Sequence, residues 1–408
     1  MIYKLTIYLF VFINFIYGSV RLGNDKLINE KFNLIEGKRL GIIANHTSLL
    51  SNGQHLVDYL FESDKVKILA VFGPEHGFRG DAPAGEKIES FVDEKTGVKV
   101  FSLYGKTNKP TPEMLKDIEI LIYDIQDVGA RFYTYISTLY LCMEAAAENN
   151  IRFIVCDRPN PIGGVKIDGP ILKDSLKSFV GIANIPVQHG FTIGELALFF
   201  EMEILNKKNL EIDLTILTMD GWKRDMLFDQ TGLNWIKPSP NIVDLNGALI
   251  YPGTCLLEAT NISEGRGTFK PFYNIGAPFI NSDELIEKLN LLNLAGIKIS
   301  KTTFVPTNIP GMANKPKYTD QECRGIEIQV VNPYELQSVK VGIAILKTIY
   351  DLYPQEVKIN ENRLALLIGD KNVVKMILSK EKLENIFAYF EPELSLFNIK
   401  RKNYLLYN

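Results

Sequence analysis

Short apolar segments alternate with amphipathic segments over the first half of the chain. Nearly continuous apolar runs are typical of strands buried on both faces, and five such runs occur, at residues 39–44, 66–72, 118–125, 152–156 and 213–219. Apolar residues at helical spacing occupy the intervals at residues 54–62, 133–149 and 192–206. This alternation predicts an α/β domain with a mainly parallel sheet.

The pattern changes between residues 221 and 270, where Gly, Pro and Asn become frequent and loops are expected. Beyond this stretch the spacing predicts a second α/β unit, with helices over 282–292 and 339–351 and strands over 298–305 and 325–331. We therefore expect two domains, at residues 19–270 and 271–408.

Residues 1–18 differ from the rest of the chain. Lys4 precedes an apolar run over residues 5–17, which is shorter than the roughly 20 residues needed to cross a bilayer. The run has the length of the apolar region of a signal peptide, and the small residues Gly18 and Ser19 follow it. The sequence predicts a cleaved signal peptide over residues 1–18 and a mature protein that is periplasmic or secreted, with no membrane attachment. A buried strand or an uncleaved anchor is the alternative.

Polar residues follow four of the predicted strands at their carboxyl ends. Because these ends meet at one edge of a parallel sheet, we expect the four loops to converge on a site. The candidates are Asn45 and His46 in the first loop, Glu75, His76 and Arg79 in the second, Asp124, Gln126, Asp127, Arg131 and Tyr133 in the third, and Arg158 and Asn160 in the fourth. Each could instead have a structural role in a turn, cap or ion pair, and this alternative is weakest for Glu75.

The residue types in these loops narrow the chemistry. The chain has no P-loop and no GxGxxG after a strand, so we expect no nucleotide cofactor. It also lacks a GxSxG elbow, an HExxH motif and zinc-ribbon Cys pairs. The remaining carboxylates, amides, His and aromatic residues suit carbohydrate hydrolysis, in which a protonated Glu donates to the glycosidic oxygen. The Arg residues suggest an anionic group on the ligand.

Composition excludes other classes of protein. Lys and Arg number 45 and Asp and Glu number 48, so the formal charge is −3. Without a basic block, the chain does not look like a nucleic-acid binder. Four Cys in 408 residues do not make a disulfide framework, and four His leave little material for a site with several metal ions.

Five motifs occur in order along the chain: GPEHGFRG at 73–80, YDIQDVGARFYTY at 123–135, DRPNP at 157–161, HGFTIGELA at 189–197 and TNISEGRGT at 260–268. Together they resemble the NamZ-type exo-β-N-acetylmuramidases, glycoside hydrolase family 171. The motifs add His189, Asn261, Glu264 and Arg266 to the candidate substrate-binding residues. The resemblance implies a Rossmann-like N-terminal domain, a smaller α/β C-terminal domain and an active site in the cleft between them. It also implies release of N-acetylmuramic acid from the non-reducing end of peptidoglycan-derived glycans.

These observations suggest a mechanism with Glu75 as general acid and with His76 or His46 tuning its pKa or orienting the substrate. The second catalytic group would be Asp124, Asp127, Glu264 or the 2-acetamido group of the substrate. Arginines of the loops would bind the lactyl carboxylate of N-acetylmuramic acid. Two alternatives stay open, a non-catalytic muropeptide-binding protein and a metal-dependent cell-wall hydrolase. The sequence does not indicate an oligomeric state.

Overall fold

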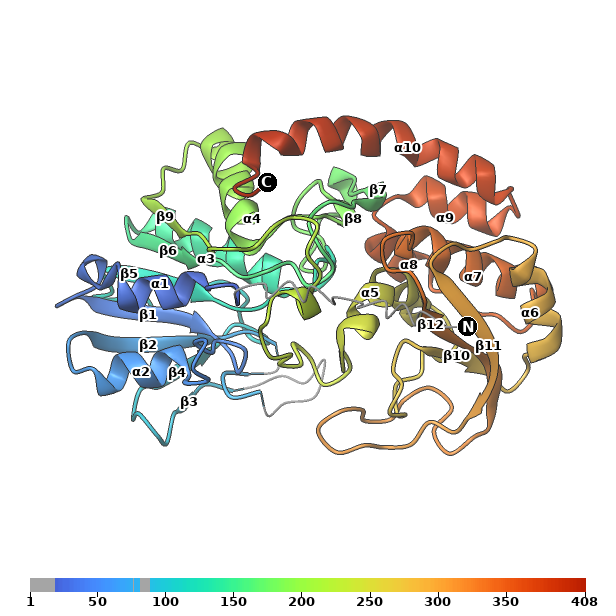
Figure 1. Ribbon diagram of the computed structural model, residues 1–408, viewed down its shortest axis with the longest axis horizontal. Helices are drawn as coiled ribbons and strands as arrows, with labels where there is room; N and C mark the ends of the chain where they lie inside the picture. The colour runs from blue at the N-terminus through green and yellow to red at the C-terminus, as the bar shows by residue number, and fades with distance from the viewer. Residues whose placement is uncertain (1–18, 76, 81–88) are drawn as a thin grey trace, which may run out of the picture.

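Two sheets, one of seven strands and one of three, organise the computed structural model, which describes residues 19–75, 77–80 and 89–408 (Figure 1). A third, two-stranded sheet lies between the two units. The predicted signal peptide, residues 1–18, and the candidate His76 lie outside the described residues.

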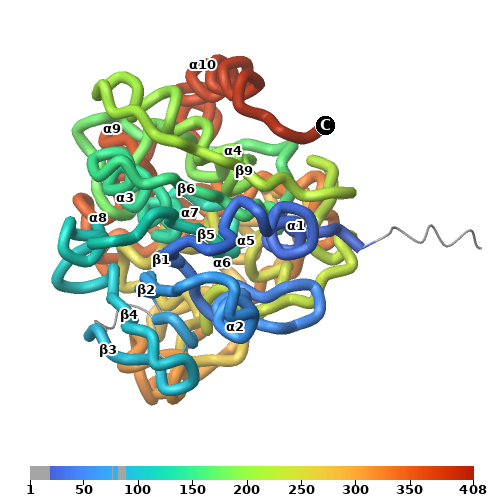
Figure 2. The backbone as a smooth tube through the Cα atoms, turned by 90° about the vertical axis from the view of Figure 1, so that its left-hand side faces the viewer, coloured from blue at the N-terminus to red at the C-terminus, as the bar shows by residue number. Residues whose placement is uncertain are grey.

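The N-terminal sheet has the strand order β3-β4-β2-β1-β5-β6-β9, which runs from bottom to top in Figure 2. Neighbouring strands are parallel except for the pair β3 and β4. The chain leaves the central β1 first toward β2 and later toward β5, so the crevice at the carboxyl ends of β1 and β5 is the topological switch point where such sheets bind ligands. The strands are β1 (Arg39–Ala44), β2 (Lys67–Gly73), β3 (Phe91–Val92), β4 (Lys99–Ser102), β5 (Ile120–Asp124), β6 (Arg152–Cys156) and β9 (Leu214–Leu217).

Helices cover both faces of this sheet, which is why its strands are almost wholly apolar. On β1, Leu40 and Ile42 belong to the apolar cluster of α1 and α2, whereas Ile43 belongs to that of α3 and α4. The helices are α1 (Gly23–Asn29), α2 (Leu56–Glu62), α3 (Tyr135–Glu148) and α4 (Ile193–Phe200), the last continued by a π-helical turn at Glu201–Leu205. The predicted α/β class with a mainly parallel sheet is confirmed, and all five predicted strands are present.

The C-terminal unit has a smaller, antiparallel sheet with the order β10-β12-β11. Helices pack against this sheet and against one another (Figure 1). The elements are β10 (Asn274–Ala277), β11 (Ile297–Phe304), β12 (Cys323–Val330), α5 (Leu245–Thr254), α6 (Ser282–Asn290), α7 (Ser338–Leu352), α8 (Glu361–Ile368) and α9 (Lys371–Leu378).

Helix α5 corrects the expectation of loops between residues 221 and 270. Its Pro252 and Gly253 resemble turn residues in the sequence, but the helix contains both. A Cβ atom on Gly253 would lie 1.9 Å from the carbonyl oxygen of Ser338 at the start of α7. Gly253 is therefore required by the close approach of two helices rather than by a turn.

The last helix and the chain end tie the two units together. Helix α10 (Leu383–Lys400) runs over the hairpin of β7 (Asp168–Ile171) and β8 (Pro186–Gln188) toward α4 (Figure 1). Beyond it, the Tyr407 hydroxyl donates to the Asp157 carboxylate at the end of β6, and the ring of Tyr407 contacts Trp222. No helix in the described ranges is both long enough and apolar enough to cross a bilayer.

Candidate active site

Hydrogen bonds join the loops that follow β1, β5 and β6 at the switch point. The Oδ1 atom of Asn45 accepts from the backbone N–H and the hydroxyl of Thr47, at 2.9 and 2.6 Å. The Thr47 hydroxyl oxygen accepts from the Gln126 backbone N–H at 3.0 Å, and the Gln126 side chain donates to the Pro159 carbonyl at 2.7 Å. The structure thus brings together the polar residues that the sequence places after three neighbouring strands.

Asp124 and Arg158 form a buried ion pair at the base of this network. The Arg158 Nε and Nη2 atoms lie 2.6 and 3.0 Å from the two carboxylate oxygens, and Asn24 Nδ2 donates to Asp124 at 3.0 Å. Arg158 also donates to the Leu49 carbonyl. Because both oxygens of Asp124 accept hydrogen bonds from the protein, these contacts favour a positioning role for the pair over the catalytic and substrate-binding roles suggested by sequence.

Asp127 and His189 meet beneath the same loops. Asp127 Oδ2 accepts from the Gly129 N–H at 2.7 Å and lies 3.3 Å from His189 Nε2. The His189 Nδ1 atom accepts from the Phe191 N–H, which places the proton of a neutral ring on Nε2, facing Asp127. Asn160 donates to the Phe191 carbonyl at 2.9 Å. All these side chains are buried, so they fix the loops relative to β8.

The structure corrects the role expected for Arg131. Its side chain is fully buried and donates to the carbonyls of Pro170, Ile185 and Leu367, the last in α8 of the C-terminal unit. Burial lowers its pKa to about 9. Arg131 therefore links the two units and cannot reach a substrate anion.

Arg79 and Arg266 are also neutralised within the protein. Arg79 lies 2.9 Å from both Asp58 and Asp93. Burial would raise the pKa of Asp58, but Arg79 and Lys95 together outweigh it and hold the pKa below its usual value. Arg266 lies 2.7 Å from Glu258 and 3.2 Å from Glu264. With Arg131 and Arg158, every arginine expected to bind the substrate anion already has protein partners.

Glu75 lies among hydroxyl-bearing side chains in the loop after β2. Its Oε2 atom accepts from the Thr134 hydroxyl at 2.9 Å, at the start of α3. Burial, together with the charge and hydrogen bond of Glu75, raises the pKa of Tyr104 to about 12. Burial and the same carboxylate also raise the pKa values of Tyr133 and Tyr135, whose rings lie edge to face with centroids 4.7 Å apart. Glu75 is half-buried, so its carboxyl group combines aromatic surroundings with access to solvent.

His46 holds the loop that carries Glu75. Its Nε2 atom forms a hydrogen bond of 2.8 Å with the Lys237 carbonyl. A Cβ atom on Gly80 would lie 2.6 Å from the His46 ring, and Gly80 has a φ of +84°. Glycine is required there on both counts. Pro238, which follows Lys237 in the chain, accepts from the Tyr135 hydroxyl through its carbonyl oxygen at 2.9 Å.

The C-terminal unit contributes charged residues from the segment after α5. Glu264 lies 2.8 Å from Lys317 as well as beside Arg266. Asn261 is bound to backbone, since its side chain donates to the Glu356 carbonyl and accepts from the Lys358 N–H. Asn261 therefore fastens two loops of this unit together.

Sequence reasoning missed four residues near these groups: Tyr104, Glu258, Lys317 and Arg363. Tyr104 follows β4, a strand of four residues that was not expected. Its loop was therefore not recognised as a fifth loop at the carboxyl ends of the strands. Recognising that short strand would have identified Tyr104. Arg363 lies in the first turn of α8, a partly buried helix whose sequence carries no signal of a site.

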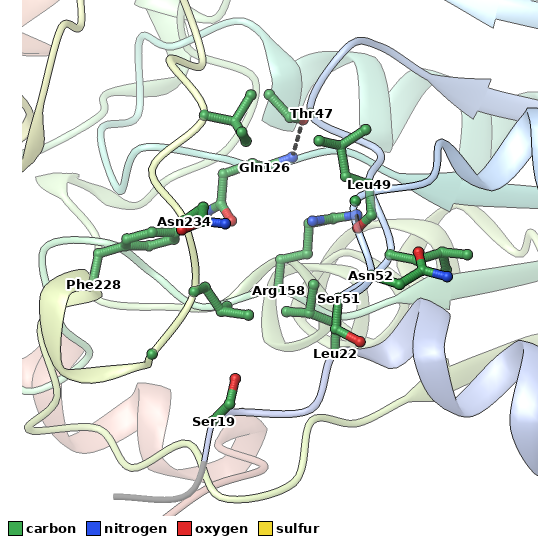
Figure 3. Close-up of a pocket in the computed structure, with 15 residues that line it drawn as sticks. Ser19, Leu22, Thr47, Leu49, Ser51, Asn52, Gln126, Arg158, Phe228 and Asn234 are labelled. Atoms are coloured by element: carbon green, nitrogen blue, oxygen red, sulfur yellow. Dashed lines mark hydrogen bonds between the residues drawn. The ribbon is translucent and has the colours of Figure 1, made fainter.

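A cavity of about 280 Å³ also opens at the switch point (Figure 3). Thr47, Gln126 and Arg158 line it together with Phe228 and Asn234, and Glu75 does not. Within residues 19–75, 77–80 and 89–408, no three His, Cys, Asp or Glu side chains are grouped to hold a metal ion.

Comparison with known proteins identifies the family. The N-terminal family model of the exo-β-N-acetylmuramidase NamZ matches residues 40–246, and the C-terminal one matches residues 249–407. The chain belongs to the NamZ family. The resemblance inferred from the five motifs is thereby confirmed, and the protein is a glycoside hydrolase.

NamZ relatives match nearly the whole chain. Peptidoglycan β-N-acetylmuramidase NamZ of Bacillus subtilis strain 168 is 46% identical over 390 residues, which are 95% of this chain and 92% of the relative. Crystal structures of two DUF1343 family proteins from Bacteroides fragilis match with TM-scores of 0.86 and 0.74, at 35% and 34% identity. Each match covers 96% of this chain and 99% of the other. The two-domain α/β fold is therefore that of the NamZ family.

Proposed function

We propose that this protein releases N-acetylmuramic acid from the non-reducing end of peptidoglycan-derived glycans, with Glu75 as the general acid. The single observation that carries the proposal is the placement of Glu75, half-buried among Thr134, Tyr104, Tyr133 and Tyr135. A carboxyl group held in such a position can act as the proton donor to a leaving-group oxygen. Membership of the NamZ family supports the choice of substrate.

In this mechanism the neighbours of Glu75 direct its proton. The hydrogen bond with Thr134 helps to hold the carboxyl group in one orientation, as proton donation to a glycosidic oxygen requires. The buried rings of Tyr133 and Tyr135 pack against each other near this carboxyl group, whose charge contributes to the raised pKa values of both hydroxyls.

The remaining carboxylates support assistance by the substrate. Asp124, Asp127 and Glu264 are each buried and each accepts from cations or N–H groups of the protein. A carboxylate so engaged is a poor nucleophile or base for a water molecule. We therefore favour attack by the 2-acetamido oxygen of N-acetylmuramic acid on its own anomeric carbon, as some glycosidases use.

One incubation tests the activity. The purified protein is mixed with the disaccharide of N-acetylmuramic acid linked β-1,4 to N-acetylglucosamine, and the products are followed by mass spectrometry. We expect both monosaccharides. The matched control is the disaccharide with the two sugars in the reverse order, which should stay intact because N-acetylglucosamine occupies its non-reducing end. An intact first disaccharide would instead indicate a binding protein, and activity lost in EDTA and restored by zinc would indicate a metal-dependent hydrolase.

We also propose that the protein is exported. The apolar run over residues 5–17, preceded by Lys4 and followed by Gly18 and Ser19, supports this proposal. Amino-terminal sequencing of the protein from the periplasm or the culture medium should begin at or near Ser19. Recovery of the uncleaved chain from the cytosol alone would contradict it.

A further inference from the structure

Five charged side chains of the C-terminal unit form what we call the C-terminal charge cluster. Glu258 pairs with Arg266 at 2.7 Å and with Arg363 at 3.4 Å. Glu264 pairs with Arg266 at 3.2 Å and with Lys317 at 2.8 Å. Three cations thus face two carboxylates, and the cluster keeps one positive charge without a matching negative charge.

That unmatched charge lies at Arg363. Lys317 also donates to the carbonyls of Leu257 and Ile262, at 2.9 Å each. Arg266 lies between two carboxylates and over the ring of Phe272. Arg363 has the longest ion pair of the cluster, and its side chain is 39% exposed, compared with 26% for Arg266 and 28% for Lys317. It is therefore the cation most available to a ligand.

Arg363 lies at the junction of the two units. It projects from α8, the helix whose Leu367 carbonyl accepts from Arg131 of the N-terminal unit. Its charge also acts across this junction, because it opposes the rise in the pKa of Tyr104 that burial and Glu75 produce. Tyr104 in turn is hydrogen-bonded to Glu75. From the C-terminal unit, the charge of Arg363 thus reaches Tyr104, a neighbour of Glu75.

We propose that Arg363 binds the lactyl carboxylate of N-acetylmuramic acid and so selects this sugar over N-acetylglucosamine. The inference rests on the proposed function and adds the residue that sets its specificity. A guanidinium group can offer two parallel N–H donors to a carboxylate. On binding, Arg363 exchanges its long contact with Glu258 for the substrate, while Glu258 keeps Arg266 at 2.7 Å. The lactyl carboxylate of the bound substrate then balances the one unmatched positive charge of the C-terminal charge cluster.

The test compares chromogenic glycosides of the two sugars in Arg363→Met. Charge-assisted hydrogen bonds are strong, so we expect kcat/KM for the muramide to fall about 10- to 100-fold more than kcat/KM for the glucosaminide. Arg363→Lys, which keeps the charge but not the fork, should give an intermediate ratio. The matched control is Arg152→Met. Arg152 is 32% exposed, pairs with Asp213 at 3.8 Å and begins β6, so it lies at the amino ends of the parallel strands, away from the loops of the candidate site. It should keep the wild-type ratio.

Two further measurements keep the inference separate from the proposed function and from folding. Wild-type enzyme should prefer the muramide over its lactyl primary amide, which has nearly the same shape without the charge; equal rates would overturn the inference without any variant. If wild type cleaves no muramide, the proposed function fails. Calorimetric binding of free N-acetylmuramic acid then tests whether Arg363 recognises the carboxylate. We expect the wild type to bind this sugar more tightly than Arg363→Met does. Equal losses for both glycosides, or equal affinities, would mean that Arg363 does not recognise the carboxylate.

Discussion

Glu75→Gln should lower turnover of a 4-nitrophenyl N-acetylmuramide by about 10²- to 10⁴-fold, the usual contribution of general acid catalysis. Glutamine keeps the size of the side chain and can still accept from Thr134, but it has no acidic proton to give. KM should change little, because the variant removes proton donation rather than sugar contacts. Steady-state kinetics on folded protein, checked by circular dichroism, provide the measurement.

The leaving group supplies the sharper test of this role. A 2,4-dinitrophenolate departs without protonation, so the loss caused by Glu75→Gln should shrink markedly on the dinitrophenyl glycoside. Glu211→Gln is the matched control, since Glu211 is exposed, and it should behave like wild type on both substrates. Near-wild-type rates for Glu75→Gln, or an equal loss on both leaving groups, would remove Glu75 from the role of general acid.

Arg158→Met should lower the free energy of unfolding by about 3–5 kcal/mol, because it leaves the buried carboxylate of Asp124 without its cation. The two groups are 5% and 0% exposed, so the carboxylate loses its cation in a largely desolvated position. Urea denaturation followed by fluorescence measures the change. The free energy of unfolding of Arg158→Lys, which keeps the charge, should fall between those of the wild type and Arg158→Met. Arg39→Met provides the matched control; its partner Glu119 lies 3.7 Å away on the surface, and the loss should stay below about 1 kcal/mol.

The opposite result would reassign the pair. If Arg158→Met unfolds at the wild-type urea concentration yet loses binding of the muramide, Arg158 contacts the substrate and does not simply hold the loops. Asp124→Asn should likewise lose stability before it loses chemistry. A stable but inactive Asp124→Asn would return Asp124 to the list of candidate catalytic carboxylates.

The sheet could be predicted because burial on both faces leaves a direct mark on sequence. The segments that form β1 and β6 were predicted at the observed residues. A short continuous apolar run is typical of a strand that is covered by helices on both faces of its sheet. The order of polar loops along the chain likewise predicted their meeting at one edge. Helix α5 could not be recognised, because Gly253 serves a contact with a helix more than eighty residues away.

The roles of the arginines could not be predicted, because an ion pair depends on partners that sequence does not bring together. Arg79 pairs with Asp58, which lies 21 residues earlier in the chain, and with Asp93, which lies 14 residues later. Arg131 reaches Leu367, 236 residues further on. A motif shows that a guanidinium group is present, but only the fold shows whether its charge is already neutralised. Glu75, whose loop offers it little apolar packing, is half-buried and bonded to the Thr134 hydroxyl, and its role as general acid stays a prediction.

The contact of Tyr407 with Asp157 bears on how the protein is made. The two residues are 250 positions apart, yet the Tyr407 hydroxyl completes the carboxyl edge of the N-terminal sheet. During synthesis, this contact cannot form until Tyr407 has left the ribosome. The loops around the site therefore gain this support only after the C-terminal unit has been translated.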